Sequence, residues 1–523
     1  MKYIYYNIVL FLWGCQILNA QIPVWQWAKS AGSINLDRSN GITSDNYGNS
    51  YITGFAGGIY FDSIYIDSYY YIAKYTNQGD IEWAHGITGN GIAEGLSIVS
   101  DNYGYIYVTG RCGDTVIFEN DTIIGSSCLF ITKYNTQGDV IWSKGFDGIN
   151  GSQRGNSIIT DIYGNIYVTG YFGSDTLDIG NTNLINQGTD DIFIAKLDSS
   201  GNVEWAKGFG GIYDDNGSDI SVDSFGNVYV TGTFLSPSII IDSIELVNKS
   251  HYDPFVLKLN NNGNAVWCKN FGGYGPDYSY HVVNDSSGNL YLSGIFQNDT
   301  LQFSSLTLID SSGLSGYSNF LVKLDSSGNS LWGKSWSQNS MFLEDMIVDS
   351  DNNLLITGLY NGSTFVCNFD SSGDSLWTVQ SFCSISHGIT VDVSGNIVIT
   401  GTFGDYCVFG TDTITNVEIG SWWEDIFVAK LSNSVSGINI KTNNNSLIIF
   451  PNPVTDNLTI DFHKDISNQS EFRIEINDIS GRINRYATIH NNESLNISTL
   501  LPGVYIIKVY NDRDVAVGKF IKE

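Results

Sequence analysis

The chain has 523 residues, of which 42% are hydrophobic, 13% aromatic and 15% charged, and it holds 56 glycines and 7 prolines. This composition excludes a disordered chain and is typical of short strands joined by tight turns. The 54 acidic and 25 basic residues give a formal net charge of −29, which disfavours nucleic acid or an anionic membrane surface as a partner.

The first 20 residues are predicted to be a secretory signal peptide. Lys2 precedes a short apolar run at residues 8–13, and Ala20 is the small residue expected before a cleavage point. The run is too short to cross a membrane, which takes about 20 residues. We therefore expect cleavage after Ala20 and no membrane span in the chain that is left.

Two phrases recur along the chain and predict its fold. The first, Asp-x-x-Gly-Asn-x-Tyr-Val-Thr-Gly, occurs at residues 161–170 and 223–232. Variants of it end at five more glycines, Gly54, Gly110, Gly294, Gly358 and Gly401. The second, read at 193–205 as Phe-Ile-Ala-Lys-Leu-Asp-Ser-Ser-Gly-Asn-Val-Glu-Trp, ends on a tryptophan in most units. These tryptophans are Trp83, Trp142, Trp205, Trp267, Trp332 and Trp377.

Each unit is predicted to form four strands. Polar and apolar residues alternate in the strands, and the Asp-x-x-Gly-Asn and Asp-Ser-Ser-Gly-Asn phrases are typical of the turns between them. A four-stranded sheet repeated with one tryptophan per unit indicates a β-propeller blade. Because the tryptophans recur in strand register, we expect them to pack between neighbouring sheets rather than to form a surface that stacks on sugars.

The two ends of the repeat region are predicted to meet. The seventh third strand, at 427–431, has no tryptophan after it, whereas Trp27, in the segment 25–29, has no blade before it. Pairing the two completes the last blade and leaves no free sheet edge. The sequence thus predicts an all-β fold in which residues 21–433 form a seven-bladed β-propeller closed by the N-terminal strand.

Most units carry an insertion between the second and third strands that is predicted to form an extra hairpin. Cys112 and Cys128 lie on the two arms of one insertion, so we expect a disulfide there, since an exported chain permits disulfides. Cys367, Cys383 and Cys407 lie close in sequence, and two of them pair or all remain buried thiols.

Four insertions contain Asp, then Ser or Thr, then an apolar residue. The hydroxyl residues are Ser63, Thr122, Ser243 and Thr413. The pattern resembles the O-glycosylation motif of exported Bacteroidetes proteins, which makes these residues candidate glycan acceptors. The alternative is a turn followed by a β-branched strand residue, which needs no sugar.

The repeat resembles a known family. The order of an insertion, then Asp-x-Phe-Val-Ala-Lys-Leu, then Asp-Ser-Ser-Gly-Asn-x-x-Trp is similar to the SBBP-type β-propeller repeat of secreted bacterial proteins. The resemblance covers the chain from about Gln21 to Asn433. It implies an extracellular scaffold and supplies no shared catalytic residues.

A second pattern occupies the C-terminal part of the chain. Residues 434–446 are polar and predict a linker, and the short alternating strands of 447–523 predict a small Ig-like β-sandwich. Three phrases resemble the type A sorting domain of the type IX secretion system, although Phe450 stands where Tyr is commoner. The matching residues are Pro451, Asn452, Pro453, Gly481, Gly503 and Tyr505. The resemblance implies the type IX secretion machinery as a partner and export through the periplasm to the medium or the outer cell surface.

Two binding motifs are better explained by the repeat. Residues 328–335 match a phosphate-binding loop, but their lysine is the repeat lysine that follows a blade tryptophan, and no helix is predicted there. The segment that starts at Asp349 and Asp351 resembles the start of a calcium-binding loop but lacks the glycine and the glutamate of such a loop. The equivalent segments of the other units are predicted to be hairpin turns. We expect no cofactor, and these two residues are the first candidates if calcium binds.

Catalysis has little support in the sequence. The six histidines are scattered, and Asp191, Asp253 and Asp425 share one repeat position, which favours turn capping. Trp336, Trp422 and Trp423 fall outside the repeat register and are candidates for an exposed contact, although packing is favoured.

Three hypotheses for function follow. The first is an exported, non-enzymatic propeller that serves as a scaffold for binding or adhesion to an extracellular protein or glycan. The alternative is a secreted hydrolase or lyase that acts on polysaccharide with acidic residues near the central channel, since a propeller can bring carboxylates together from different blades. The third is a structural subunit that associates through its insertions.

Overall fold

The computed structural model describes residues 23–297, 300–309, 316–337, 341–420, 423–432, 446–450, 454–463, 471–478, 483–490, 494–510 and 515–522. The chain divides into two compact units after Ser434. The expected signal peptide, most of the expected linker, Trp422, Pro451, Asn452, Pro453 and Gly481 lie outside the described residues.

The described residues of the first unit form seven sheets with four core strands each, named here blades 1 to 7. From the first strand to the fourth, blade 1 holds β2 (Arg38–Ser44), β3 (Ser50–Phe55), β6 (Tyr70–Tyr75) and β7 (Ile81–His85). Blade 2 holds β9 (Ile92–Ser100), β10 (Ile106–Phe118), β11 (Asp121–Tyr134) and β12 (Val140–Phe146), with β8 (Thr88–Gly89) paired to β10. Blade 3 holds β13 (Gln153–Thr160), β14 (Ile166–Phe172), β17 (Asp191–Leu197) and β18 (Val203–Phe209). Blade 4 holds β19 (Asp215–Val222), β20 (Val228–Phe234), β23 (Asp253–Leu259) and β24 (Ala265–Asn270).

The remaining three blades follow the same order. Blade 5 holds β25 (Tyr278–Asn284), β26 (Leu290–Gln297), β29 (Tyr317–Leu324) and β30 (Ser330–Ser337). Blade 6 holds β31 (Met341–Val348), β32 (Leu354–Tyr360), β33 (Ser363–Phe369) and β34 (Ser375–Ser381). Blade 7 holds β35 (Ile385–Val391), β36 (Ile397–Phe403), β39 (Asp425–Leu431) and, from the start of the chain, β1 (Trp25–Ala31).

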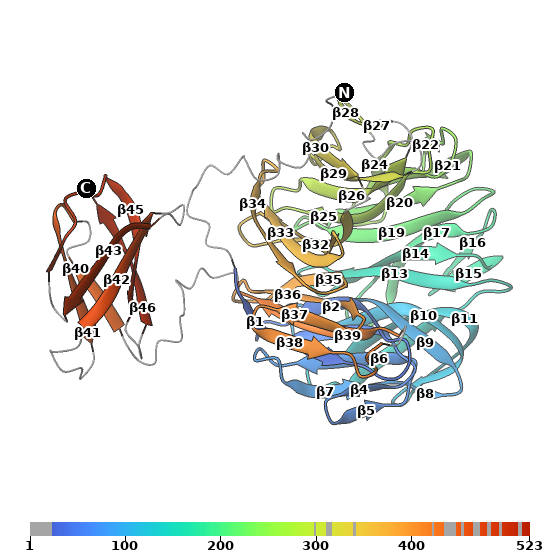
Figure 1. The fold of residues 1–523 in the computed structure, drawn as a ribbon. Coiled ribbons are helices and arrows are strands. Elements are labelled where there is room, and N and C mark those ends of the chain that lie inside the picture. The colour runs from blue at the N-terminus through green and yellow to red at the C-terminus, as the bar shows by residue number, and fades with distance from the viewer. Residues whose placement is uncertain are drawn as a thin grey trace. The chain divides into compact units, whose positions relative to one another are not determined.

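The blades form a closed ring. The first strand of each blade contacts the first strand of the next, from β2 to β35, and β35 contacts β2. β1 pairs antiparallel with β39, with Lys29 opposite Val428, so the N-terminal strand completes the last blade as the sequence predicts. In Figure 1 the blue β1 runs beside the orange strands of blade 7.

Five insertions form separate two-stranded hairpins beside their blades. They are β4 (Ile59–Phe61) with β5 (Ile64–Ile66), β15 (Thr176–Ile179) with β16 (Thr182–Ile185), β21 (Ser238–Ile241) with β22 (Ile244–Val247), β27 (Thr300–Phe303) with β28 (Leu306–Ile309), and β37 (Tyr406–Phe409) with β38 (Asp412–Thr415). In blade 2 the insertion extends the paired strands β10 and β11 without a break. Blade 6 has none, and Tyr360 pairs directly with Ser363.

The recurring aspartate fixes the turn between the first two strands. In blade 3, Asp161 Oδ1 accepts the backbone N–H groups of Tyr163 and Asn165, both at 2.9 Å. Its Oδ2 accepts Asn165 Nδ2 at 2.7 Å and the Tyr167 hydroxyl at 3.1 Å, while Gly164 takes a positive φ of 80°. The phrase Asp-x-x-Gly-Asn-x-Tyr therefore encodes one hydrogen-bonded turn.

The repeat tryptophans join neighbouring blades. In blade 3, the Trp205 indole donates to the Asn261 carbonyl of blade 4 at 3.1 Å. The ring lies against Gly263, where an added Cβ would come within 2.8 Å of it. Trp27 makes the same contact with Gly79 and donates to the Asn77 carbonyl of blade 1 at 3.1 Å. The expectation that these rings pack between sheets is confirmed.

The described residues of the second unit form two sheets around one core. One sheet holds β40 (Ser446–Phe450), β41 (Asn457–His463) and β44 (Ser494–Asn496). The other holds β42 (Glu471–Asp478), β43 (Ile483–His490), β45 (Gly503–Tyr510) and β46 (Val515–Lys522). Leu458 and Ile460 of the first sheet pack with Ile474 and Ile507 of the second, the arrangement of a β-sandwich. Among the described residues there is no helix long and apolar enough to span a membrane.

Candidate functional site

Every first strand carries a one-residue bulge at the same point. In blade 3 the pairing with β14 passes from Gly155 to Ser157 and leaves Asn156 unpaired. Gly170 on β14 permits the bulge, because a Cβ there would lie 1.9 Å from the Arg154 carbonyl oxygen. A bulge re-aims the side chain that it carries. The seven bulge residues are Asn40, Leu96, Asn156, Ser218, Tyr280, Glu344 and His387.

Four of these bulge residues meet at a pocket among the first strands of blades 3 to 6, which we call the channel mouth. Its volume is about 500 Å³, and four bulge residues, from Asn156 to Glu344, line it. Aromatic side chains there are Tyr171, Tyr280 and Phe342. The amides of Asn156, Asn216 and Asn319 and the charged groups of Arg154 and Glu344 complete its polar lining. The pocket therefore combines apolar ring faces with hydrogen-bonding groups.

Two aspartates beside the channel mouth are engaged in joining blades. Asp219 accepts the Ser157 hydroxyl at 2.6 Å and the Val282 N–H at 2.8 Å. Asp345 accepts the Ile389 N–H at 2.9 Å and lies 3.9 Å from His281 Nδ1. Burial raises the pKa of Asp345 to about 6.

A second pair of an acidic residue and a histidine is Glu344 with His387. Their side chains are 30% and 28% exposed, and Glu344 Oε2 lies 3.5 Å from His387 Nδ1. Within the described part of the chain, neither side chain bonds to the backbone of a neighbouring blade as Asp219 and Asp345 do. His387 contacts the Thr402 hydroxyl at 3.3 Å. These two groups are therefore free to meet a ligand.

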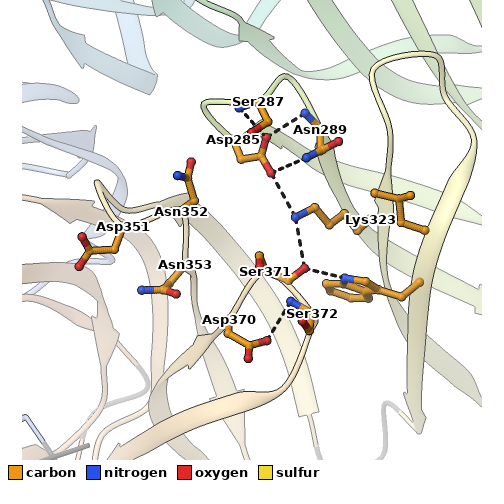
Figure 2. A pocket seen from close by; sticks show the side chains of 12 residues that line it. Asp285, Ser287, Asn289, Lys323, Asp351, Asn352, Asn353, Asp370, Ser371 and Ser372 are labelled. Carbon is orange, nitrogen blue, oxygen red and sulfur yellow. Dashed lines mark hydrogen bonds and ion pairs between the residues drawn. The ribbon is translucent and has the colours of Figure 1, made fainter.

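A second cavity, of about 650 Å³, lies between blades 5 and 6 (Figure 2). There Lys323 forms an ion pair with Asp285 at 3.1 Å and donates to the Ser371 carbonyl at 3.2 Å. Trp332 donates to the same carbonyl at 3.1 Å. The same contacts recur elsewhere: Lys430 pairs with Asp392 at 2.7 Å in blade 7. This cavity is lined by the repeat scaffold and offers no group special to itself.

Asp349 and Asp351, the calcium candidates, also belong to this turn scaffold. Asp349 Oδ1 accepts the N–H groups of Asp351 and Asn353 at 2.9 and 2.8 Å. Among the residues that the structure describes, no group of three or more His, Cys, Asp or Glu is placed to hold a metal ion.

Paired aspartates are buried at three of the contacts between blades. Asp191 of blade 3 faces Asp215 of blade 4, and Asp425 of blade 7 faces Asp37 of blade 1. Asp253 and Asp277 are buried at the equivalent positions of blades 4 and 5. The first member of each pair caps a loop, as expected: Asp191 Oδ2, for example, accepts the Gln187 N–H at 3.0 Å. Where one member is absent, so is the other: the equivalents at the contact between blades 2 and 3 are Cys128 and Gln153.

Burial raises the pKa of Asp37, Asp191, Asp215, Asp253 and Asp425. It raises the pKa of Asp191 and of Asp37 to about 7 and that of Asp425 to about 6. The Oδ1 atom of Asp191, of Asp253 and of Asp425 has no hydrogen-bond partner among the residues that the structure describes. The pairs therefore retain protons that an exposed aspartate would lose.

The predicted disulfide is present. Cys112 is bonded to Cys128 across β10 and β11. Of the three cysteines left open, Cys383 is bonded to Cys407, and Cys367 is a free, buried thiol. The Cys383–Cys407 bond connects the end of blade 6 with the β37 hairpin of blade 7.

The four candidate glycan acceptors are exposed at hairpin tips. They are Ser63, Thr122, Ser243 and Thr413. The aspartate before three of them has a structural role, since Asp121 accepts the Ser143 N–H at 2.6 Å, Asp242 the Ala265 N–H at 2.8 Å and Asp412 the Ala28 N–H at 3.2 Å. Each bond holds the hairpin to the outer strand of its own blade, which accounts for the aspartate without a sugar.

The remaining expected residues also have clear positions. Trp336 is half-buried and packs with Phe369 of blade 6 at a ring distance of 6.5 Å, whereas Trp423 is 48% exposed. In the second unit, Gly503 begins β45, and the buried Tyr505 donates its hydroxyl to the Leu501 carbonyl at 2.9 Å.

The channel mouth was missed by sequence reasoning. The bulge residues differ from blade to blade, so no motif marks them. An alignment of the seven units would have shown variable residues just before the apolar residue of strand one, as in Asn156-Ser-Ile158 and Glu344-Asp-Met346.

Two family models match the chain. Residues 448–523 match the secretion system C-terminal sorting domain, and residues 204–233 match the β-propeller repeat, SBBP. The chain therefore carries a type IX sorting domain and a propeller repeat, as expected, and is exported to the cell surface or the medium.

Curated relatives match only in part. An uncharacterized WD repeat-containing protein, L264, of Acanthamoeba polyphaga mimivirus is 26% identical over 357 residues, which is 56% of this chain and 26% of the relative. The regulatory protein FlaEY of Caulobacter vibrioides is 26% identical over 212 residues, 37% of this chain and 22% of the relative. The chain thus spans about a quarter of the length of these relatives.

Solved structures are similar at the level of a propeller alone. The Dos1 propeller has a TM-score of 0.40 at 9% identity, covering 78% of this chain and 95% of its own. A puromycin hydrolase mutant has a TM-score of 0.39 at 7% identity, and the match covers 94% of this chain and 59% of the mutant's chain.

Proposed function

From an exported chain that carries a propeller repeat and a sorting domain, we propose a non-enzymatic binding protein whose channel mouth captures an extracellular glycan. The ligand would place the flat C–H face of a sugar against the aromatic rings and its hydroxyl groups against the amides and Glu344. The net charge of −29 favours a neutral or cationic sugar over an anionic one.

The observation that carries the proposal is the divergence of the bulge residues. Turn aspartates, blade tryptophans and strand-two glycines repeat because the fold needs them. Two bulge residues also join blades, since the amides of Asn40 and Asn156 donate to the Gly95 and Gly217 carbonyls of the next blade, both at 2.8 Å. Tyr280, Glu344 and His387 depart from this pattern, and their large, polar and different side chains support a ligand at this surface.

Binding is favoured over catalysis by the state of the carboxylates. Asp219 and Asp345 accept backbone N–H groups from a neighbouring blade. A carboxylate whose hydrogen bonds join two blades is less available to exchange protons with a substrate.

The test is affinity for a panel of soluble neutral oligosaccharides, measured by calorimetry on the whole chain and on the Tyr280→Ala and Glu344→Gln variants. We expect each variant to weaken binding about tenfold, as for a central contact residue. Tyr274→Ala is the matched control, because Tyr274 is 78% exposed and does not line the pocket. Binding that is unchanged in both channel variants would refute the proposal.

The second candidate function is hydrolysis or cleavage of a polysaccharide. It is favoured by the raised pKa of Asp345, about 6, with Asp219 and His281 nearby, since glycosidases use two carboxyl groups, one of them with a raised pKa. Release of reducing ends from a polysaccharide, lost at least about 10²-fold in Asp345→Asn, would support it against the binding proposal. Equal release by the variant and the unmodified chain would exclude Asp345.

A further inference from the structure

Four exposed aromatic residues occupy the same position in four consecutive blades. Each is the third residue of the turn between the first two strands. They are Tyr47, Tyr103, Tyr163 and Phe225, which are 77%, 66%, 70% and 79% exposed. Single exposed apolar residues are ordinary on a protein surface, but a set repeated in register is not. We call these four residues the aromatic arc.

The turn does not need the aromatic rings. The third residue contributes its backbone N–H to the turn aspartate, as Tyr47 does to Asp45 at 2.8 Å and Phe225 to Asp223 at 2.9 Å. Ser287 in blade 5 and Ser394 in blade 7 make the same bond at 3.0 and 2.8 Å. A serine therefore satisfies the fold, and the aromatic ring is additional to it.

The four rings follow one another from blade to blade. The first strands of blades 1 to 4 contact one another in chain order, so their turns follow each other around the ring. Asn46 Nδ2 of blade 1 donates to the Asn102 carbonyl of blade 2 at 3.1 Å. The Tyr103 ring lies against the turn of blade 3, where a Cβ added at Gly164 would be 3.4 Å from it.

The row lies at the opposite end of the first strands from the channel mouth. The pocket there includes Arg154 and Phe342, close to where β13 and β31 begin. The arc follows the strand ends, as Tyr163 follows Thr160. The two surfaces are therefore separate on each blade.

The charge of the arc indicates its partner. Its turns, residues 45–49, 101–105, 161–165 and 223–227, contain no lysine or arginine. Their aspartates are buried, and each accepts several hydrogen bonds, as Asp45 does from Asn49 at 2.9 Å and from Tyr51 at 2.9 Å. The arc thus presents uncharged rings and amides such as Asn46, without the cations that an anionic polymer would require.

We propose that the aromatic arc binds a neutral polysaccharide chain. Successive sugars stack their C–H faces on successive rings, and the turn amides meet their hydroxyl groups. A chain suits the arc better than a single sugar, because several weak contacts along one polymer add to a useful avidity. This surface is distinct from the channel mouth and does not depend on the function proposed for it.

The test replaces each ring by the serine that sibling blades carry, in the variants Tyr47→Ser, Tyr103→Ser, Tyr163→Ser and Phe225→Ser and in all four combined. Retention of the propeller is measured by affinity electrophoresis in gels containing soluble β-glucan, xylan or mannan, and on insoluble cellulose, with polygalacturonate as the anionic comparison. Tyr274→Ser is the matched control for loss of an exposed ring elsewhere. Thermal unfolding shows whether each variant keeps its fold.

We expect retention by at least one neutral polysaccharide, a loss of about tenfold or more in the combined variant, and smaller losses in the single variants. Tyr274→Ser should retain the polymer as the unmodified chain does, and the four ring substitutions should lower retention equally with and without Tyr280→Ala, which separates this surface from the channel mouth. Equal retention by the combined variant, or no retention of the unmodified chain by any neutral polymer, would overturn the proposal. A dimer that the combined variant abolishes would also overturn it, because the arc would then be an interface between two copies.

Discussion

Two contacts between blades are built differently, and the difference shows how this ring closes. At the contact between blades 7 and 1, Lys430 and Trp27 reach the turn that joins β6 to β7, through Asn77 and Gly79. At the contact between blades 6 and 7 no such turn exists, because β39 and β1 come from opposite ends of the repeat region. The position of the lysine is occupied there by Asn368.

A covalent bond crosses this incomplete contact. The Cys383–Cys407 disulfide joins the segment after β34 to the hairpin of blade 7. A buried lysine there would lack the carbonyl acceptor that the next blade supplies to Lys323 and Lys430, so the replacement by Asn368 agrees with the missing turn. The repeat thus departs from its own pattern where closure removes the partner of a side chain.

Removal of β1 should have the largest effect. A chain that lacks residues 21–31 leaves blade 7 with three strands and exposes the edge of β39, which favours aggregation. We expect loss of the monomeric, cooperatively unfolding protein, measured by size-exclusion chromatography and thermal unfolding. A synthetic peptide of residues 21–33 added in trans should restore the unfolding transition. A truncated chain as stable as the full one would show that β1 does not close the ring.

Loss of Lys430, at the contact between blades 7 and 1, should have the second largest effect. Lys430 and Asp392 are both fully buried. Burial opposes ionisation of Asp392, but hydrogen bonds from Lys430 and Asn396 outweigh it and lower its pKa. Lys430→Met leaves this carboxylate unpaired, which should cost about 3–5 kcal/mol in the free energy of unfolding. The double variant with Asp392→Asn should recover most of the loss; no recovery would mean that packing, not charge, sets the cost.

The disulfide at the incomplete contact should matter more than the one inside blade 2. Separations of 24 residues for Cys383–Cys407 and 16 for Cys112–Cys128 predict nearly equal chain-entropy gains, about 3 kcal/mol each. Replacing both cysteines of a pair by serine should lower the midpoint of thermal unfolding further for Cys383 with Cys407, because the bond also holds two blades together. Equal losses would indicate that the contact between blades 6 and 7 is as firm as the others without it.

The paired aspartates should give the smallest effect, a dependence of stability on pH. The pKa of Asp191 is raised to about 7 in the folded chain, against about 3.9 in an unfolded one. The folded state therefore binds more protons between about pH 4 and pH 7, so its stability falls as the pH rises through this window and levels off above it.

Each such group contributes at most about 1.4 kcal/mol per pH unit. Asp191→Asn should flatten the plot of the unfolding midpoint against pH, whereas Asp198→Asn, on an exposed turn with a lowered pKa, should not. An unchanged slope in Asp191→Asn would assign the pH dependence to other groups. The contact between blades 6 and 7, with Ser363 and Ser384 at the paired positions, has no such pair.

Much of the fold could be predicted because its motifs are local. The turn around Asp161 is complete within seven residues, so its phrase is visible in the sequence. The closing strand could be predicted from the sequence, because Trp27 has no unit before it and the seventh unit has no tryptophan after its third strand. The candidate site could not be predicted in this way, because Asn156, Tyr280 and Glu344 come from three blades and share no motif.

The sequence by itself determined the strands, the turns, the closure and the export signal, since each depends on residues adjacent in the chain or repeated at regular intervals. Only the tertiary structure decided which residues meet across blades. The Asp191–Asp215 and Asp253–Asp277 pairs have the same spacing in the sequence, but Asp425 meets Asp37 only because the ring closes. The channel mouth and the aromatic arc likewise exist only after the sheets have been placed around one axis, because four blades contribute to each surface and no blade forms it alone.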